Sequence, residues 1–155
     1  MATRIEIHEI EEKLKPLFGK KAWGVALGVG SFITFEFGKP LPPYTTKQGR
    51  EVVHGEWHLW VYDCAWRLET ADGVLVASED ERSEIEKAIK SLEGAALKSV
   101  ELFPPALDTI LTFDNGLILR LFPIYSSDVD HWMLFTPEKK VLTIGPGTDW
   151  SYEDE

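Results

Sequence analysis

With 155 residues, 44% of them hydrophobic and 12% aromatic, the chain can bury the core of one domain, 1–155, which excludes disorder for most of its length. A single cysteine, Cys64, excludes an intrachain disulfide. The sequence also has no long apolar run and no secretion signal, and together these features predict a cytoplasmic protein without membrane segments. The formal charge of −10 is divided into +1 over residues 1–60 and −11 over residues 61–155, which disfavours nucleic acid and anionic membranes as partners and admits a basic protein.

The first predicted element is a short amphipathic helix that ends near Lys15. Its apolar residues recur at helical spacing, Thr3 can cap its first turn, and Glu6 completes a capping box. Pro16 disfavours a helical conformation at the residue before it. The sequence therefore sets both ends of this helix.

A hairpin and a long loop follow the helix. The hairpin has arms at 22–27 and 31–37, and the second arm points Glu36 away from its apolar face. Residues 38–55 contain three prolines and no consistent apolar period, so they form the longest predicted loop. Loops of this length are often binding elements or mobile covers, although a short strand at 51–53 would reduce the length of this one.

The stretch from Glu56 to Ser78 organises the predicted sheet. It begins with a Trp-rich arm that is apolar on both faces, reaches Asp72-Gly73, and continues as a second arm, the pattern of a hairpin whose turn needs a positive φ. A strand with one solvated face would alternate apolar and polar residues. We therefore expect the first arm to be a single central strand that is covered on both faces for most of its length.

The rest of the chain predicts one more helix and further antiparallel strands. The helix covers 81–92, where an acidic cluster complements its N-terminus, and Asn-Gly marks a hairpin turn after Asp114. Strands are expected at 97–103, 109–113, 117–122, 132–136 and 141–144. Residues 146–155 are expected to form a flexible acidic tail that docks only at Trp150 or Tyr152. The predicted fold is α+β, a mostly antiparallel curved sheet of sequential hairpins with about nine short strands and two helices.

The histidines suggest one candidate site. His54, Glu56 and His58 would share a face of a strand, which gives a small-ligand or hydrolase-like site beneath the 38–55 loop, with His131 as a further member. A straight strand places the outer two histidines ~13 Å apart at Cα, too far for one ion with bonds of ~2 Å, so no metal site is predicted. The chain has no phosphate-binding loop, and no cofactor is predicted.

Acidic residues suggest a second candidate site. Asp63 lies in the most apolar run of the chain, and Asp128 and Asp130 lie in a polar loop; an exposed strand end and a solvated turn are the simpler interpretations. If the protein binds a basic partner, complementary charge and an aromatic anchor would carry the contact. The expected contact residues are Asp63, Glu69, Asp72, Asp128, Asp130 and the anchor Trp132.

Four pieces of the chain carry a resemblance to a family of small bacterial single-domain proteins: GKKAWGVALGVGSFITFEFG, GEWHLWVYDCAWRLE, a helix ending in SLEG, and LTFDNGLILRLFP with a later Trp. Similar folds occur among immunity proteins, which neutralise the toxins of competing bacteria. The resemblance implies a non-enzymatic, immunity-like protein that occludes a basic protein partner. Its motifs are turn and core residues, so it brings no catalytic residue to this chain. The His/Glu ligand site is the alternative, and self-association is not indicated.

Overall fold

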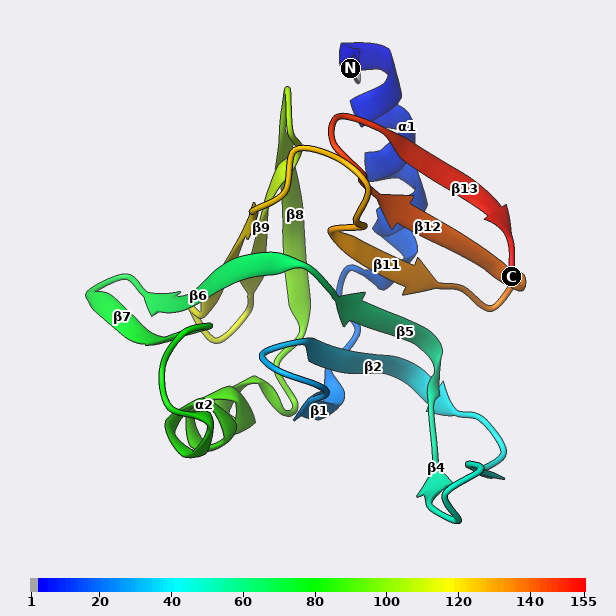
Figure 1. The fold of residues 1–155 in the computed structure, drawn as a ribbon, viewed down its shortest axis with the longest axis vertical. Helices are drawn as coiled ribbons and strands as arrows, with labels where there is room; N and C mark the ends of the chain where they lie inside the picture. Colours follow the sequence, from blue (N-terminus) through cyan, green and yellow to red (C-terminus); the bar gives the residue numbers. More distant parts are fainter. Residues whose placement is uncertain (1–2) are drawn as a thin grey trace.

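A computed structural model describes residues 3–155, which form two α-helices and 13 strands in open antiparallel sheets (Figure 1). The predicted fold class, α+β with mostly antiparallel pairing, is confirmed. The strands form two main sheets instead of one. The first sheet has the order β1-β2-β5-β11-β12-β13 and the second β7-β6-β10-β9-β8, while β3 and β4 form a small ribbon. No helix within residues 3–155 is both long and apolar enough to cross a membrane.

The helices and most strands lie where the sequence predicts them. The elements in chain order are α1 (Arg4–Leu14), β1 (Trp23–Leu27), β2 (Ile33–Pro40), β3 (Tyr44–Thr45), β4 (Glu51–Val52), β5 (Gly55–Val61), β6 (Cys64–Thr70), β7 (Gly73–Ala77), α2 (Arg82–Ile89), β8 (Leu97–Phe103), β9 (Asp108–Phe113), β10 (Ile118–Pro123), β11 (Trp132–Phe135), β12 (Lys140–Ile144) and β13 (Trp150–Asp154). The capping box of α1 is present: the Glu6 amide donates to the Thr3 hydroxyl at 3.1 Å, and the Thr3 amide donates to the Glu6 carboxylate at 2.7 Å.

The core lies between the two main sheets. The rings of Phe35 on β2 and Phe113 on β9 stack 6.1 Å apart, and the indole N–H of Trp132 on β11 donates to the Thr109 hydroxyl on β9 at 3.0 Å. The helices close the open sides of this sandwich. In Figure 1, α1 lies behind β11–β13 and beside β8, while α2 lies next to β7. Within residues 3–155, the main contacts of the helices with strands are with β8 for α1 and with β7 and β1 for α2.

The Trp-rich arm was predicted as one strand, and this was wrong. The chain leaves the first sheet after Val61 and enters the second at Cys64, so β5 and β6 are interior strands of different sheets. At this corner the amide of Tyr62 donates to the carbonyl of His131, 2.9 Å away. Only one face of β5 is buried, since its side chains alternate between buried and half-buried positions, so the expected cover on both faces is absent.

Two further expectations were wrong. The hairpin between β6 and β7 has Thr70 paired with Gly73, and its turn residues Ala71 and Asp72 have negative φ, so no positive φ is needed. The C-terminal tail docks at Trp150 and Tyr152, as expected, but the residues between and beside them are not a flexible tail. Residues 150–154 form β13 along β12, because Trp150 and Tyr152 pack against the core and so place the strand in register.

Prediction one concerns the core. Phe35 is 0% exposed and stacks on two other phenylalanines, whereas Phe122 on β10 is 61% exposed. Phe35→Ala should lower the free energy of unfolding by about 3–5 kcal/mol through lost burial and a residual cavity. The matched change Phe122→Ala should stay within about 0.5 kcal/mol of the parent. Urea titrations followed by Trp fluorescence measure both values, and equal losses would contradict the sandwich arrangement.

Candidate functional site

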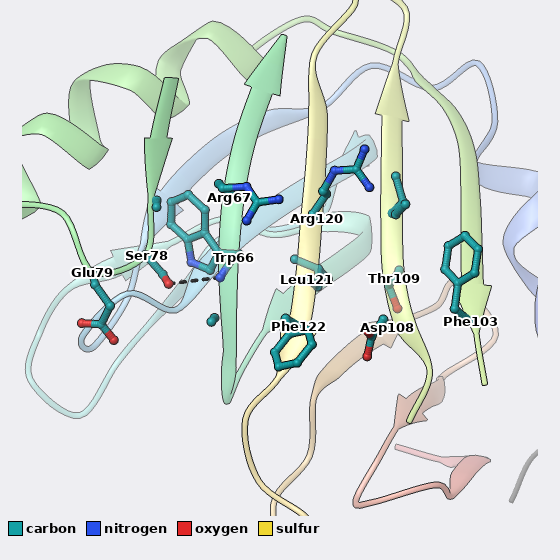
Figure 2. A pocket seen from close by; sticks show the side chains of 13 residues that line it. Trp66, Arg67, Ser78, Glu79, Phe103, Asp108, Thr109, Arg120, Leu121 and Phe122 are labelled. Atoms are coloured by element: carbon teal, nitrogen blue, oxygen red, sulfur yellow. Dashed lines mark hydrogen bonds between the residues drawn. The ribbon is translucent and has the colours of Figure 1, made fainter. Parts of the chain in front are cut away.

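The outer face of the second sheet carries one hollow of about 630 Å³ (Figure 2). Phe103 and Phe122 form its apolar part, and Arg67 and Arg120 stand beside them on neighbouring strands. Both guanidiniums are already paired with the carboxylate of Glu69, at 2.7 and 3.1 Å. One carboxylate on this face is therefore shared by both guanidiniums.

The outer face of the first sheet carries a cavity that combines polar groups with aromatic walls. It has a volume of about 610 Å³ and lies against the 38–55 loop, which contributes Leu41, Pro42 and Tyr44. The sheet contributes His58 and Trp60 from β5 and Phe135 from β11, and His54 closes the end nearest the loop. We call this space the loop cavity. It lies at the position that the sequence predicts for a ligand site.

A buried carboxylate organises the polar end of this region. Glu36 on β2 lies directly across from His58 on β5, and its side chain is only 5% exposed. One oxygen, Oε1, accepts from the Gly55 amide at 2.8 Å and lies 3.3 Å from Nδ1 of His54. The other, Oε2, lies 2.6 Å from Nδ1 of His58. An unpaired carboxylate at this depth would cost several kcal/mol, so these three donors make the fold compatible with the charge.

The two histidines meet because the strand is not straight. The register between β2 and β5 shifts between the Phe37–Trp57 pair and the Pro40–Gly55 pair, which is a local bulge. A Cβ on Gly55 would lie 2.5 Å from the Phe37 carbonyl oxygen, so only glycine permits this close approach. The ring centroids of His54 and His58 are 4.2 Å apart. The distance argument against a shared site, which assumed a straight strand, was therefore wrong.

The hydrogen bonds define a chain of four side chains, Tyr44–His54–Glu36–His58. An ionised carboxylate only accepts, so both imidazoles present Nδ1–H to Glu36. The Tyr44 hydroxyl lies 2.9 Å from Nε2 of His54. No residue within 3–155 bonds to Nε2 of His58, which is left as a free acceptor. A histidine held in this way by a carboxylate can act as a general base toward a bound molecule or water.

The other predicted members of the ligand site lie elsewhere or have another role. Glu56 lines the loop cavity, but its carboxylate accepts from the Lys39 amide at 2.8 Å and does not join the histidines. His131 is buried at the corner between the sheets, four residues before Phe135 along the chain, or roughly 13 Å in extended structure. Sequence reasoning missed Glu36; the signal was a single charge in the apolar run from Ile33 to Phe37.

The predicted acidic contact residues do not form one surface. Asp63, Asp128 and Asp130 are close to the corner, where the Asp63 amide donates to the Asp130 carbonyl at 3.4 Å. Asp72 lies at the far end of the seven-residue strand β6, roughly 23 Å away. Trp132 was predicted as an exposed anchor, and this was wrong: it is 2% exposed and belongs to the core.

Glu69 and Cys64 also have structural roles. Burial raises the pKa of the Glu69 carboxyl, but hydrogen bonds from Arg67 and Arg120 outweigh this effect and hold the pKa below its usual value. Burial, with the nearby charges of Asp63 and Asp108, raises the pKa of the Cys64 thiol to about 12. The thiol donates to the His131 carbonyl at 3.3 Å. Cys64 is therefore not a nucleophile at neutral pH.

No protein-family model, curated protein or solved structure matches the chain. The loop cavity and its four connected side chains are therefore interpreted from their own geometry and chemistry.

Prediction two uses His131. Neither ring nitrogen has a hydrogen-bond partner within residues 3–155, and burial lowers the pKa of the imidazole, although Asp130 and Asp108 act in the opposite direction. Below the free-histidine pKa of ~6.5, the unfolded chain therefore binds a proton that the folded chain resists, and stability falls as the pH falls. His131→Leu should remove this part of the decline.

The measurement is the free energy of unfolding of the parent and of His131→Leu at several pH values between about 7 and 5. The parent should lose stability faster than the variant as the pH falls, by at most about 1.4 kcal/mol per pH unit. Parallel curves for the two proteins would contradict a buried, neutral His131.

Proposed function

We propose that this protein binds a small molecule in the loop cavity, with His58 at the polar end and aromatic side chains along the walls. The single observation that carries this proposal is the convergence of Glu36, His54 and His58 beside a cavity of about 610 Å³. Ligand sites are typically hollows of this size with mostly apolar walls and a few oriented polar groups. The sequence analysis gave a ligand site beneath the 38–55 loop as its alternative hypothesis; the present proposal has Glu36 in place of Glu56.

The walls indicate the kind of molecule that fits. Trp60 is half-buried on the outer face of β5, and Phe135 contacts the His58 ring with centroids 5.7 Å apart. A flat apolar body can pack between these side chains. Nε2 of His58 can accept from a hydroxyl or amine of the ligand, and the buried charge of Glu36 stabilises a partial positive charge at that end.

Prediction three tests the cavity with a library of small aromatic compounds, using ligand-observed NMR. Compounds that bind the parent should bind Trp60→Ala about tenfold more weakly, because ~50 Å² of lost apolar contact corresponds to ~1.3 kcal/mol. His58→Ala should weaken the binding of compounds that carry a hydrogen-bond donor group. The control is His8→Ala, which removes an exposed histidine of α1. Binding that is unchanged in both cavity variants would contradict the proposal.

A second candidate function is the occlusion of a basic protein partner, as in an immunity-like protein. The favouring observation is a cluster of exposed apolar side chains, Phe122, Ile124 and Tyr125, that precedes Asp128 and Asp130 in the connection to β11. Aromatic side chains bordered by charge are typical of protein-binding surfaces. In this version, Tyr125 and Phe122 take the anchoring role that the sequence analysis gave to Trp132.

Prediction four tests this surface by affinity capture from source-cell lysate. The parent should recover a basic protein at low salt, and Asp128→Lys should reduce recovery several-fold because steering by opposite charges is lost. The control Asp72→Lys changes the net charge equally at the tip of the β6–β7 hairpin. No recovered protein, or equal loss in both variants, would count against the second candidate.

A further inference from the structure

The side chains around Glu36 have the composition of a transition-metal site. Glu36, His54 and His58 each offer one ligand atom, and the three atoms lie within 4.8 Å of one another. Two imidazole nitrogens and one carboxylate oxygen suit Zn²⁺ and similar ions, whereas Ca²⁺ and Mg²⁺ prefer oxygen ligands. We propose that these three residues bind one divalent transition-metal ion, for which Zn²⁺ is the best match, and that this ion receives the polar group of the molecule bound in the loop cavity.

The distances require little rearrangement. Tetrahedral coordination with bonds of ~2.0–2.1 Å places neighbouring ligand atoms ~3.3 Å apart. Nδ1 of His54 is 3.3 Å from Oε1 of Glu36, which already matches this spacing. Nδ1 of His58 is 2.6 Å from Oε2, so its ring would have to move back by ~0.7 Å. His58 is on the half-buried outer face of β5, between the loop cavity and a second hollow of about 830 Å³ that Glu36 also lines, so space for this movement adjoins the ring.

Outer contacts support the ligand geometry. A histidine that binds a metal through one nitrogen usually has its other nitrogen held by a hydrogen bond, which fixes the tautomer. The Tyr44 hydroxyl, 2.9 Å from Nε2 of His54, has this position. With an ion bound at Nδ1 in place of the proton donated to Glu36, Nε2 carries the proton and donates to this hydroxyl. The Gly55 amide donates to Oε1 of Glu36 at 2.8 Å and so fixes the orientation of the carboxylate.

The charge balance also favours a cation. Glu36 is buried, and within residues 3–155 no Lys or Arg forms an ion pair with it; only the two histidines lie close. A bound divalent ion would compensate this carboxylate without requiring protonated imidazoles. Three protein ligands leave at least one coordination position open, as in sites that bind or activate a molecule. His54, His58 and Trp60 line hollows on both sides, so that position is accessible.

This inference rests on the proposed ligand site and narrows its ligand class. A metal ion at the polar end favours a molecule with a carboxylate or another anionic donor group and an apolar ring that packs against Trp60. The ion would also polarise a carbonyl group or lower the pKa of bound water, so that metal-assisted hydrolysis becomes available to the site.

Prediction five is tested by isothermal titration of ZnCl₂ into the full chain after treatment with a chelator. The parent should bind one Zn²⁺ per chain. His58→Ala and Glu36→Gln should weaken binding by more than ~100-fold, beyond the 10–100-fold typical of an outer contact, while Tyr44→Phe should fall within that range. The control His8→Ala should bind as the parent does. Co²⁺ should give the visible absorption of a four-coordinate site in the parent and lose it in His58→Ala.

Several outcomes would overturn the inference. These are no stoichiometric Zn²⁺ binding by the parent, equal binding by the parent and a folded His58→Ala variant, or binding of Mg²⁺ or Ca²⁺ alone. Circular dichroism establishes whether each variant is folded. If Glu36→Gln does not fold, the titration of the parent decides whether the protein binds Zn²⁺. The two proposals fail separately: aromatic compounds that bind the chelator-treated chain without Zn²⁺ binding support only the cavity, and Zn²⁺ binding without any compound supports only the metal site.

Discussion

The corner at Tyr62 and Asp63 is the constraint on which the architecture depends. Here the chain passes from the first sheet to the second, and residues 130–131 pass back beside it on the return from β10 to β11. Backbone bonds to His131 and Asp130, together with the Cys64 thiol, join the two crossings. Because both sheets are fixed to one another at this point, their inner faces pack as a single core.

The corner also determines where the polar site can form. By ending β5 at Val61, it sets the register in which Trp57 and Leu59 face the core and His58 faces outward. The neighbouring strand β2 then places Glu36 across from His58, while the bulge at Gly55 brings the 38–55 loop back over the same face. A site built in this way combines rigid strands, which hold Glu36 and His58, with a loop that supplies His54 and Tyr44.

Local signals in the sequence explain what could be predicted. The capping box at Thr3, the Asn-Gly turn after Asp114 and the alternation within single strands all act over a few residues, and the elements that they indicate are present. The corner carries neither glycine nor proline, so the Trp-rich arm resembled one strand. The pairing of Glu36 with His58 joins residues 22 positions apart on two strands, and the bulge that brings His54 to them lies beyond this pair; no local pattern encodes either feature. The structure has a cavity at the predicted position beside the loop, but the carboxylate that joins His54 and His58 is Glu36, not the predicted Glu56.

Glu36 is a position at which the residue present is not the one that would give the highest stability. The strand from Ile33 to Phe37 is otherwise apolar or weakly polar, and an apolar residue opposite His58 would avoid burying a carboxylate. The fold instead surrounds this carboxylate with an amide and two imidazoles. The amide belongs to Gly55, where a side chain would collide with the Phe37 carbonyl oxygen of the neighbouring strand. Local rules are most often broken where a protein binds or reacts, because the compensation must come from the rest of the structure. On that physical ground the proposed function is placed at the buried charge of Glu36 and not on the acidic surface.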